Sequence, residues 1–162
     1  MKIIEAVANF TRPSDTTAYT SGDLVANNTT AGSVAPLTFS ISYGRGFKLQ
    51  RVTLLKTSTT VTDAQFRLHL YKDSPTVAGG DNAAWSSIVA GYLGYIDIDG
   101  QTPAFTDDAM ASGVPISNSV YAPMSILTDV DQKLYGLLEA RDTYGPASAE
   151  VFTVTLLGES YV

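Results

Sequence analysis

The chain has no cysteine among its 162 residues. Neither a disulfide framework nor a thiolate metal site can therefore form. A chain of this length can bury a core without such crosslinks. We expect one domain spanning residues 1–162.

Charged side chains are scarce. They make up 16% of the residues, against roughly 25% in typical soluble domains. The net charge is −6, and the ten Lys and Arg residues never occur three in a row. Binding to a phosphate backbone needs clustered basic residues, so we expect no nucleic-acid partner. The remaining polar surface is neutral, which suits an exposed β face or a contact with another protein.

Long apolar runs are also missing. No stretch approaches the roughly 20 apolar residues of a membrane-spanning helix. Met1 to Ile4 is followed by Glu5, which leaves no long apolar segment for a signal peptide. We therefore expect no membrane partner.

Apolar and polar residues alternate with a period of two, which is typical of strands with one buried face. The clearest segments are residues 37–43, 66–71 and 152–156. Further strands are expected at residues 3–10, 24–27, 47–56, 92–97, 114–117 and 133–141. The pattern predicts an all-β, antiparallel, jelly-roll-like β-sandwich of about 8–10 strands, with long ordered loops and at most short helical turns.

One expected strand changes the phase of its alternation. Phe47 and Leu49 share one face, whereas Val52 and Leu54 share the other. An extra residue near Gln50 would form a β-bulge and return all four side chains to one face.

Evidence for helices is thin. Residues 133–141 carry leucines in both phases, which predicts a strand buried on both faces, with a short helix as the competing interpretation. Residues 81–88 are compatible with one or two helical turns capped by Asp81 or Asn82, and residues 106–110 with another turn. None reaches the length of a stable amphipathic helix.

The sequence offers no recognisable catalytic apparatus. His69 is the only histidine and lies on the polar face of an expected strand. No Gly-x-Ser-x-Gly turn presents a serine nucleophile, and no carboxylate pair can be chosen for glycoside hydrolysis. We interpret His69 as a solvated or interface residue and predict that the protein is not an enzyme.

Asp97 and Asp99 resemble the start of a calcium loop. Thr102, however, stands where the sharp turn needs glycine, and Asp108 stands where the bidentate glutamate belongs. We interpret the segment as a strand end that enters a turn. Asp97 and Asp99 stay calcium candidates, but we predict no metal site and no cofactor.

Aromatic residues are numerous, with nine Tyr, six Phe and one Trp. Tyrosine combines an apolar ring with a polar tip and is favoured at interfaces. Trp85 is the best candidate for a protein contact or for stacking on a sugar ring, and Tyr92 joins it as an interface candidate. The alternative is that Trp85 anchors a long loop against the sandwich.

Residues 9–27 go beyond generic β character. Their sequence, NFTRPSDTTAYTSGDLVAN, resembles the opening of small structural proteins of tailed bacteriophages, in which the pattern F-x-RP-x-DTTAY-x-x-GD-x-VA-N precedes a Pro-Leu-x-Phe strand. The likeness continues through residues 36–39, 66–71, 74–76 and 80–83, and it fades after Asp97.

The resemblance implies a virion component, made in the cytoplasm of a host bacterium and placed on the phage head as a decoration or cement protein. The implied partner is the major capsid protein. Lattice symmetry favours a homo-oligomer, with a trimer at a three-fold position. Two alternatives stay open: a carbohydrate-binding module on a head or fibre that uses Trp85, and a tail or neck component.

An N-terminal extended segment of about residues 1–36 is expected to take part in docking. Arg12-Pro13 sets an extended backbone, and Asp15 to Thr17 can form side-chain turns. The segment should therefore be an ordered arm. The interface residues expected from it are Phe10, Arg12, Pro13, Asp15 and Tyr19.

Overall fold

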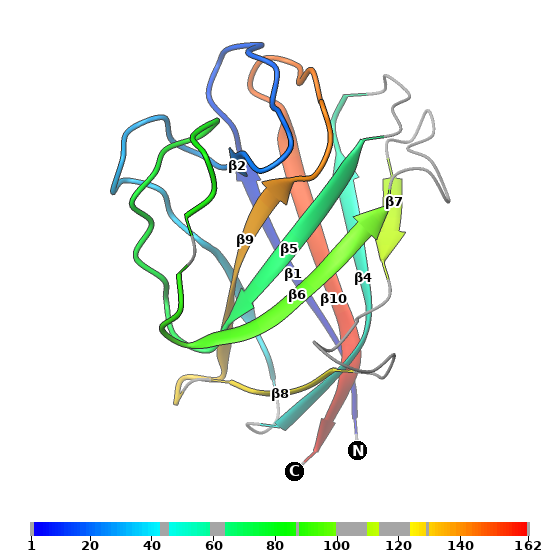
Figure 1. The fold of residues 1–162 in the computed structure, drawn as a ribbon. Coiled ribbons are helices and arrows are strands. Elements are labelled where there is room, and N and C mark those ends of the chain that lie inside the picture. The colour runs from blue at the N-terminus through cyan, green and yellow to red at the C-terminus, as the bar shows by residue number, and fades with distance from the viewer. Residues whose placement is uncertain are drawn as a thin grey trace.

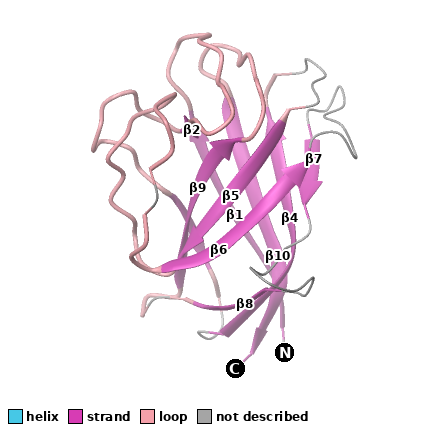
Figure 2. Ribbon diagram, viewed as in Figure 1, coloured by secondary structure: helices cyan, strands magenta, loops and turns pink. Residues whose placement is uncertain are grey.

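The structure is a computed structural model that describes residues 2–42, 46–58, 64–86, 88–99, 110–113, 124–128 and 130–161. Ten strands and no helix occur within these ranges (Figure 2). The strands are β1 (Lys2–Thr11), β2 (Leu24–Val25), β3 (Leu37–Ser40), β4 (Gly46–Lys56), β5 (Gln65–Tyr71), β6 (Tyr92–Asp99), β7 (Met110–Gly113), β8 (Met124–Leu127), β9 (Lys133–Ala140) and β10 (Val151–Tyr161). The predicted all-β class is confirmed.

The strands form two antiparallel sheets of five strands each. In the first sheet the order is β1-β10-β4, and both β7 and β8 pair with β4. In the second sheet both β2 and β3 pair with β9, and the order continues through β5 to β6. Figure 1 shows the second sheet in front of the first, with both termini at the same end of the sandwich.

The chain passes repeatedly from one sheet to the other. Because β2 and β3 share β9, and β7 and β8 share β4, each pair acts as one interrupted strand, which leaves eight. Each successive strand then changes sheet, except at the β5–β6 hairpin. This arrangement is a jelly roll, as predicted from the strand spacing.

The core lies between the sheets and follows from the alternation. Along β1, Ile4, Ala6 and Ala8 are buried, and the residues between them are exposed. Phe152 of β10 is fully buried and meets the ring of Phe66 from the second sheet at 5.7 Å. Burying one such ring contributes roughly 1.5–3 kcal/mol, so these facing rings help to hold the two sheets together.

The predicted bulge in β4 is present. Leu157 of β10 pairs with Arg51, and Gly158 pairs with Leu49, so Gln50 has no partner in this ladder. The four apolar side chains of β4 on either side of the bulge are all buried. Gly158 is required here because a Cβ atom would meet a β4 carbonyl group and a phenylalanine ring.

Several expected strands differ from the observed ones in length. The segment expected at residues 24–27 is shortened to β2, and the one expected at 37–43 ends with β3. The last strand runs on past residue 156 to the end of β10. Residues 133–140 form a strand buried on both faces over most of its length, so the helical alternative is wrong. Residues 106–109 and 114–117 lie outside the described residues.

The helical turns expected near Asp81 are absent from the described part of that segment. Asn82 has a positive φ of 63°, which breaks a right-handed helix. Asp81 does not cap a helix; its carboxylate accepts a hydrogen bond from the backbone N–H of Ala26 at 2.7 Å. A buried partner of opposite charge, Arg12, draws this side chain inward instead.

Candidate functional site

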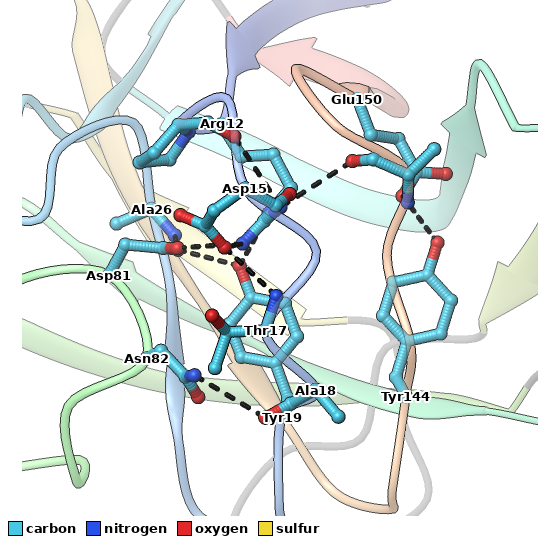
Figure 3. Close-up of polar contacts among 12 residues, drawn as sticks. Arg12, Asp15, Thr17, Ala18, Tyr19, Ala26, Asp81, Asn82, Tyr144 and Glu150 are labelled. Atoms are coloured by element: carbon cyan, nitrogen blue, oxygen red, sulfur yellow. Dashed lines mark hydrogen bonds and ion pairs between the residues drawn. The ribbon is translucent and has the colours of Figure 1, made fainter.

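A buried ion cluster joins the N-terminal segment to a distant loop (Figure 3). We call it the Arg12 cluster; it consists of Arg12, Asp15, Tyr19 and Asp81. Arg12 Nη2 lies 3.0 Å from Asp81 Oδ2, and Arg12 Nε donates to the Tyr19 hydroxyl at 2.8 Å. The Tyr19 hydroxyl donates in turn to Asp81 Oδ1 at 2.6 Å. The cluster therefore ties residues 12–19 to the loop that holds Asp81, which is distant in the sequence.

The environment of the Arg12 cluster stabilises one protonation state. Burial by itself lowers the pKa of Arg12, but the hydrogen bond to Tyr19 and the nearby carboxylates outweigh it and raise that pKa. Burial, followed by the bond to Asp81, raises the pKa of the Tyr19 hydroxyl well above its ordinary value. The guanidinium stays charged and the phenol stays neutral, so the cluster serves as a fixed structural tie.

Several residues that the sequence predicts as interface residues belong to the Arg12 cluster. Arg12 and Tyr19 are buried, so their side chains do not reach a surface that a partner could touch. Residues 2–36 contain β1 and β2 and pack on the sandwich itself. Pro13 and Asp15 are half-buried, and Asp15 also accepts from the backbone N–H of Thr17 at 3.0 Å.

Phe10 is partly buried and packs against the core. Its ring stacks on that of Phe152 with centroids 5.6 Å apart. Its main contact is therefore inside the sandwich.

A second buried ion pair, between Lys56 and Glu150, lies next to the Arg12 cluster. The ring of Tyr144 stacks parallel to that of Tyr19 at 6.3 Å, and its hydroxyl donates to Glu150 (Figure 3). Lys56 Nζ lies 3.9 Å from the Glu150 carboxylate, and both side chains are fully buried. Burial lowers the pKa of Lys56, although Glu150 opposes that shift. Sequence reasoning missed this pair.

The outward side of the second sheet carries a different group of polar side chains. In the strand register, Arg67 of β5 lies between Asp97 of β6 and Glu139 of β9. The next row along β5 holds Tyr95 and His69. We call this surface the polar face; it comprises Gln65, Arg67, His69, Tyr95, Asp97, Glu139 and Arg141.

Two arginines of the polar face are fixed by carboxylates. Arg67 makes a two-pronged contact with Asp97, at 2.6 Å from Nε and 3.0 Å from Nη2, and its guanidinium lies 3.8 Å from the centre of the Tyr95 ring. Arg141 Nη1 donates to Glu139 at 2.8 Å. The face thus presents guanidinium groups that are already oriented.

Glu139 connects Arg141 to His69. Its other oxygen lies 2.8 Å from His69 Nε2. Burial by itself raises the pKa of Glu139, but the hydrogen bonds from His69 and Arg141 outweigh it and lower that pKa below its ordinary value. Glu139 is therefore a carboxylate at neutral pH.

His69 is buried, so the expectation of a solvated side chain is wrong. It is 6% exposed because Trp85 stacks on it at 4.0 Å. Its Nδ1 lies 3.2 Å from the Tyr92 hydroxyl, and its Nε2 is held by Glu139. Both ring nitrogens therefore have partners within the protein.

Trp85 lies over the second sheet, and Tyr92 is the first residue of its strand β6. Both are partly buried against a small second core formed by Leu24, Ala26, Tyr71, Val77 and Leu137. Trp85 therefore anchors its loop, which was the alternative to a sugar-stacking platform. One face of its ring is occupied by His69.

A groove of about 260 Å³ opens where the polar face ends. Its walls are Gln65, Phe66, Arg67, Asp97, Ile98 and Arg141. The side chains of Asp97 and Arg141 are 43% and 36% exposed, so both can be reached from solvent. Within the described residues, a small molecule can enter the polar face at this groove.

The calcium candidates lie near the end of β6, and Thr102 and Asp108 of the calcium-like segment lie outside the described residues. Asp97 is paired with Arg67, and Asp99 closes the same strand opposite Gln65. No group of three or more histidine, aspartate or glutamate side chains within the described ranges could hold a metal ion.

Comparison of the chain with models of protein families and with curated proteins gave no match. In the part of the chain that the structure describes, no helix has the length and hydrophobicity to cross a membrane.

Proposed function

We propose that this protein is a virion structural protein that binds the assembled head of a tailed phage and reinforces it. The resemblance of residues 9–27 to phage structural proteins supports the proposal. The jelly roll adds support by fold-level analogy alone, because viral capsid domains use it and so do lectins.

The observation that carries the proposal is the outward side of the first sheet, which we call the first-sheet face. On β1, Ile3 and Val7 are 75% and 50% exposed. Cross-strand neighbours continue from Val7 through Thr155 to Thr53, a row without charge. The row of Ile3 does carry charge, in Glu159 and Lys48. Exposed apolar residues beside an uncharged row suit contact with another protein.

The border of this face offers a second kind of contact. Strand β1 is ten residues long and pairs with β10, and it ends the described order of its sheet. Such an edge leaves backbone N–H and C=O groups that a strand of a partner can bind.

The proposed mechanism is mechanical. A protein that binds the lattice but not the separated subunits stabilises the lattice by mass action. The partner is the major capsid protein, and copies of the chain would follow the symmetry of the lattice, with a trimer at the three-fold positions.

Cosedimentation of the purified chain with assembled phage heads and with unassembled capsid protein tests this proposal. We expect saturable binding to heads only, lost in Val7→Lys, which places a charge in the uncharged row. Val89→Lys is the matched control, because Val89 is a valine with 82% exposure outside any strand.

Equal binding of Val7→Lys and Val89→Lys would contradict docking through the first-sheet face. Quantitative mass spectrometry of purified virions gives the location. A copy number close to that of the capsid protein supports decoration, whereas a few copies per particle would assign the chain to the tail or neck.

A further inference from the structure

We propose that the groove bounded by Gln65, Arg67, Asp97 and Arg141 binds one ring of a neutral sugar. This binding site does not depend on the proposed docking to a capsid. The groove and the first-sheet face belong to opposite sheets of the sandwich, so a chain docked by one can still use the other.

The groove is preorganised. Arg67 is held from the side by Asp97 and from one face by the Tyr95 ring. Its side chain is 20% exposed and has little freedom to lose when a ligand binds. Groups that are fixed before binding lower the entropic cost of recognition.

Donors and acceptors alternate along the walls. Each oxygen of Asp97 already accepts one bond from Arg67 and can accept another. Arg141 commits Nη1 to Glu139, and its fork carries further N–H donors. Gln65 adds an amide with both functions. Neighbouring hydroxyl groups of a sugar, each a donor and an acceptor, match such a set.

The charge of the groove favours a neutral ligand over an anion. The two guanidinium groups are compensated by two carboxylates, those of Asp97 and Glu139. The whole chain carries a net charge of −6, which repels anions further.

Size limits the ligand as well. The volume of about 260 Å³ falls just below the roughly 300–1,000 Å³ usual for ligand pockets. One ring fits, and longer glycans would extend into solvent.

This site differs from the Trp85 platform considered from the sequence. The ring of Trp85 covers His69, in the neighbouring row of the polar face. The groove instead relies on paired polar groups around Arg67.

Saturation-transfer difference NMR on the full chain tests the site. The probes are the methyl glycosides of glucose, galactose, mannose and N-acetylglucosamine, with methyl glucuronate as the anionic probe. We expect at least one neutral glycoside to bind with a Kd of about 1 mM, as suits a small contact area. Methyl glucuronate should bind more weakly than methyl glucoside.

Two variants locate the binding. Arg141→Gln should weaken it about tenfold or more, because charged hydrogen bonds to the ligand are lost. Gln65→Ala should weaken it less. Arg51→Gln is the matched control, because Arg51 is an exposed arginine on β4 of the other sheet, and it should bind as the parent does. Thermal unfolding of each variant shows that it is folded.

Three results would overturn the proposal: no signal from any neutral glycoside, tighter binding of glucuronate than of glucoside, or unchanged binding in folded Arg141→Gln. Loss of capsid binding leaves this result untouched, so the two proposals fail separately.

Discussion

The Arg12 cluster and the polar face are built from the same parts but serve different ends. Each has an arginine paired with an aspartate, and in each a tyrosine ring lies beside the guanidinium, at 5.2 Å for Arg12 and 3.8 Å for Arg67. The difference is exposure. The side chains of Arg12 and Asp81 are 0% and 1% exposed, whereas those of Arg67 and Asp97 are 20% and 43% exposed.

This difference in exposure separates an ion pair that only holds the fold together from one that can still bind a ligand. A buried ion pair must satisfy every polar atom inside the protein, and loss of one partner leaves an uncompensated charge. A half-exposed pair exchanges its bonds with water at little cost. The Arg12 cluster is therefore fully used by the fold, whereas the polar face keeps bonding capacity for a ligand.

The strongest test of the comparison is to remove the aspartate from each arginine–aspartate pair. Asp81→Ala removes the buried partner of Arg12, which keeps only the half-exposed Asp15. It also leaves the buried N–H of Ala26 and the Tyr19 hydroxyl without their acceptor. We expect a loss of about 3–5 kcal/mol in the free energy of unfolding. The control Asp97→Ala should cost less than about 1 kcal/mol. Urea unfolding measures both. Similar losses in the two variants would contradict the distinction.

Removal of a hydroxyl group makes a finer test. In Tyr19→Phe, the buried Nε of Arg12 and the carboxylate of Asp81 each lose a partner. We expect a loss of about 1–3 kcal/mol by thermal unfolding. Tyr95→Phe keeps the ring beside Arg67 and should stay within about 0.5 kcal/mol of the parent. A Tyr19→Phe variant as stable as Tyr95→Phe would contradict the structural role of the Arg12 cluster.

The polar face should make a pH-dependent contribution through Glu139. Because its pKa in the folded protein lies below the ordinary value of 4.5, this carboxylate stabilises the fold above pH 4.5. That stability is lost as the pH falls through the folded pKa. Urea unfolding between pH 7 and pH 3 should show a shallower decline for Glu139→Gln than for the parent. Parallel curves would mean that Glu139 contributes nothing.

The smallest effect is expected at Tyr71, beneath the loops over the second sheet. Its hydroxyl is buried and has no hydrogen-bond partner in the described structure. Tyr71→Phe removes an unsatisfied polar atom, so its stability should equal or exceed that of the parent by up to about 1 kcal/mol. Thermal unfolding beside Tyr19→Phe tests this. A clear loss would show that the Tyr71 hydroxyl does have a partner.

Local patterns predicted much of the fold. The period-two alternation located most strands, and the phase change around Gln50 located the bulge, because both depend only on near neighbours in the chain. Strand lengths were less well predicted: β2 is shorter than expected and β10 is longer. Strand ends depend on what each strand pairs with, which local alternation does not contain.

The candidate sites were predicted less well. The sequence predicts Arg12 and Tyr19 as interface residues, whereas both side chains are buried. Their acidic partner, Asp81, lies 69 residues from Arg12 in the sequence. Similarly, His69 was placed on a polar face, but Glu139, 70 residues away, was missed. Alternation could have put Arg67 and Asp97 on outward faces, but it could not show that their strands are neighbours.

The sequence by itself therefore determined the all-β class and the phase of most strands, since these arise from residues close together, but it predicted neither β7 nor β8. Only the tertiary structure decided which charges are buried and which stay open. That choice depends on which strands and loops come together across the sandwich, and burial in turn decides whether an arginine–aspartate pair holds the fold or remains free to bind.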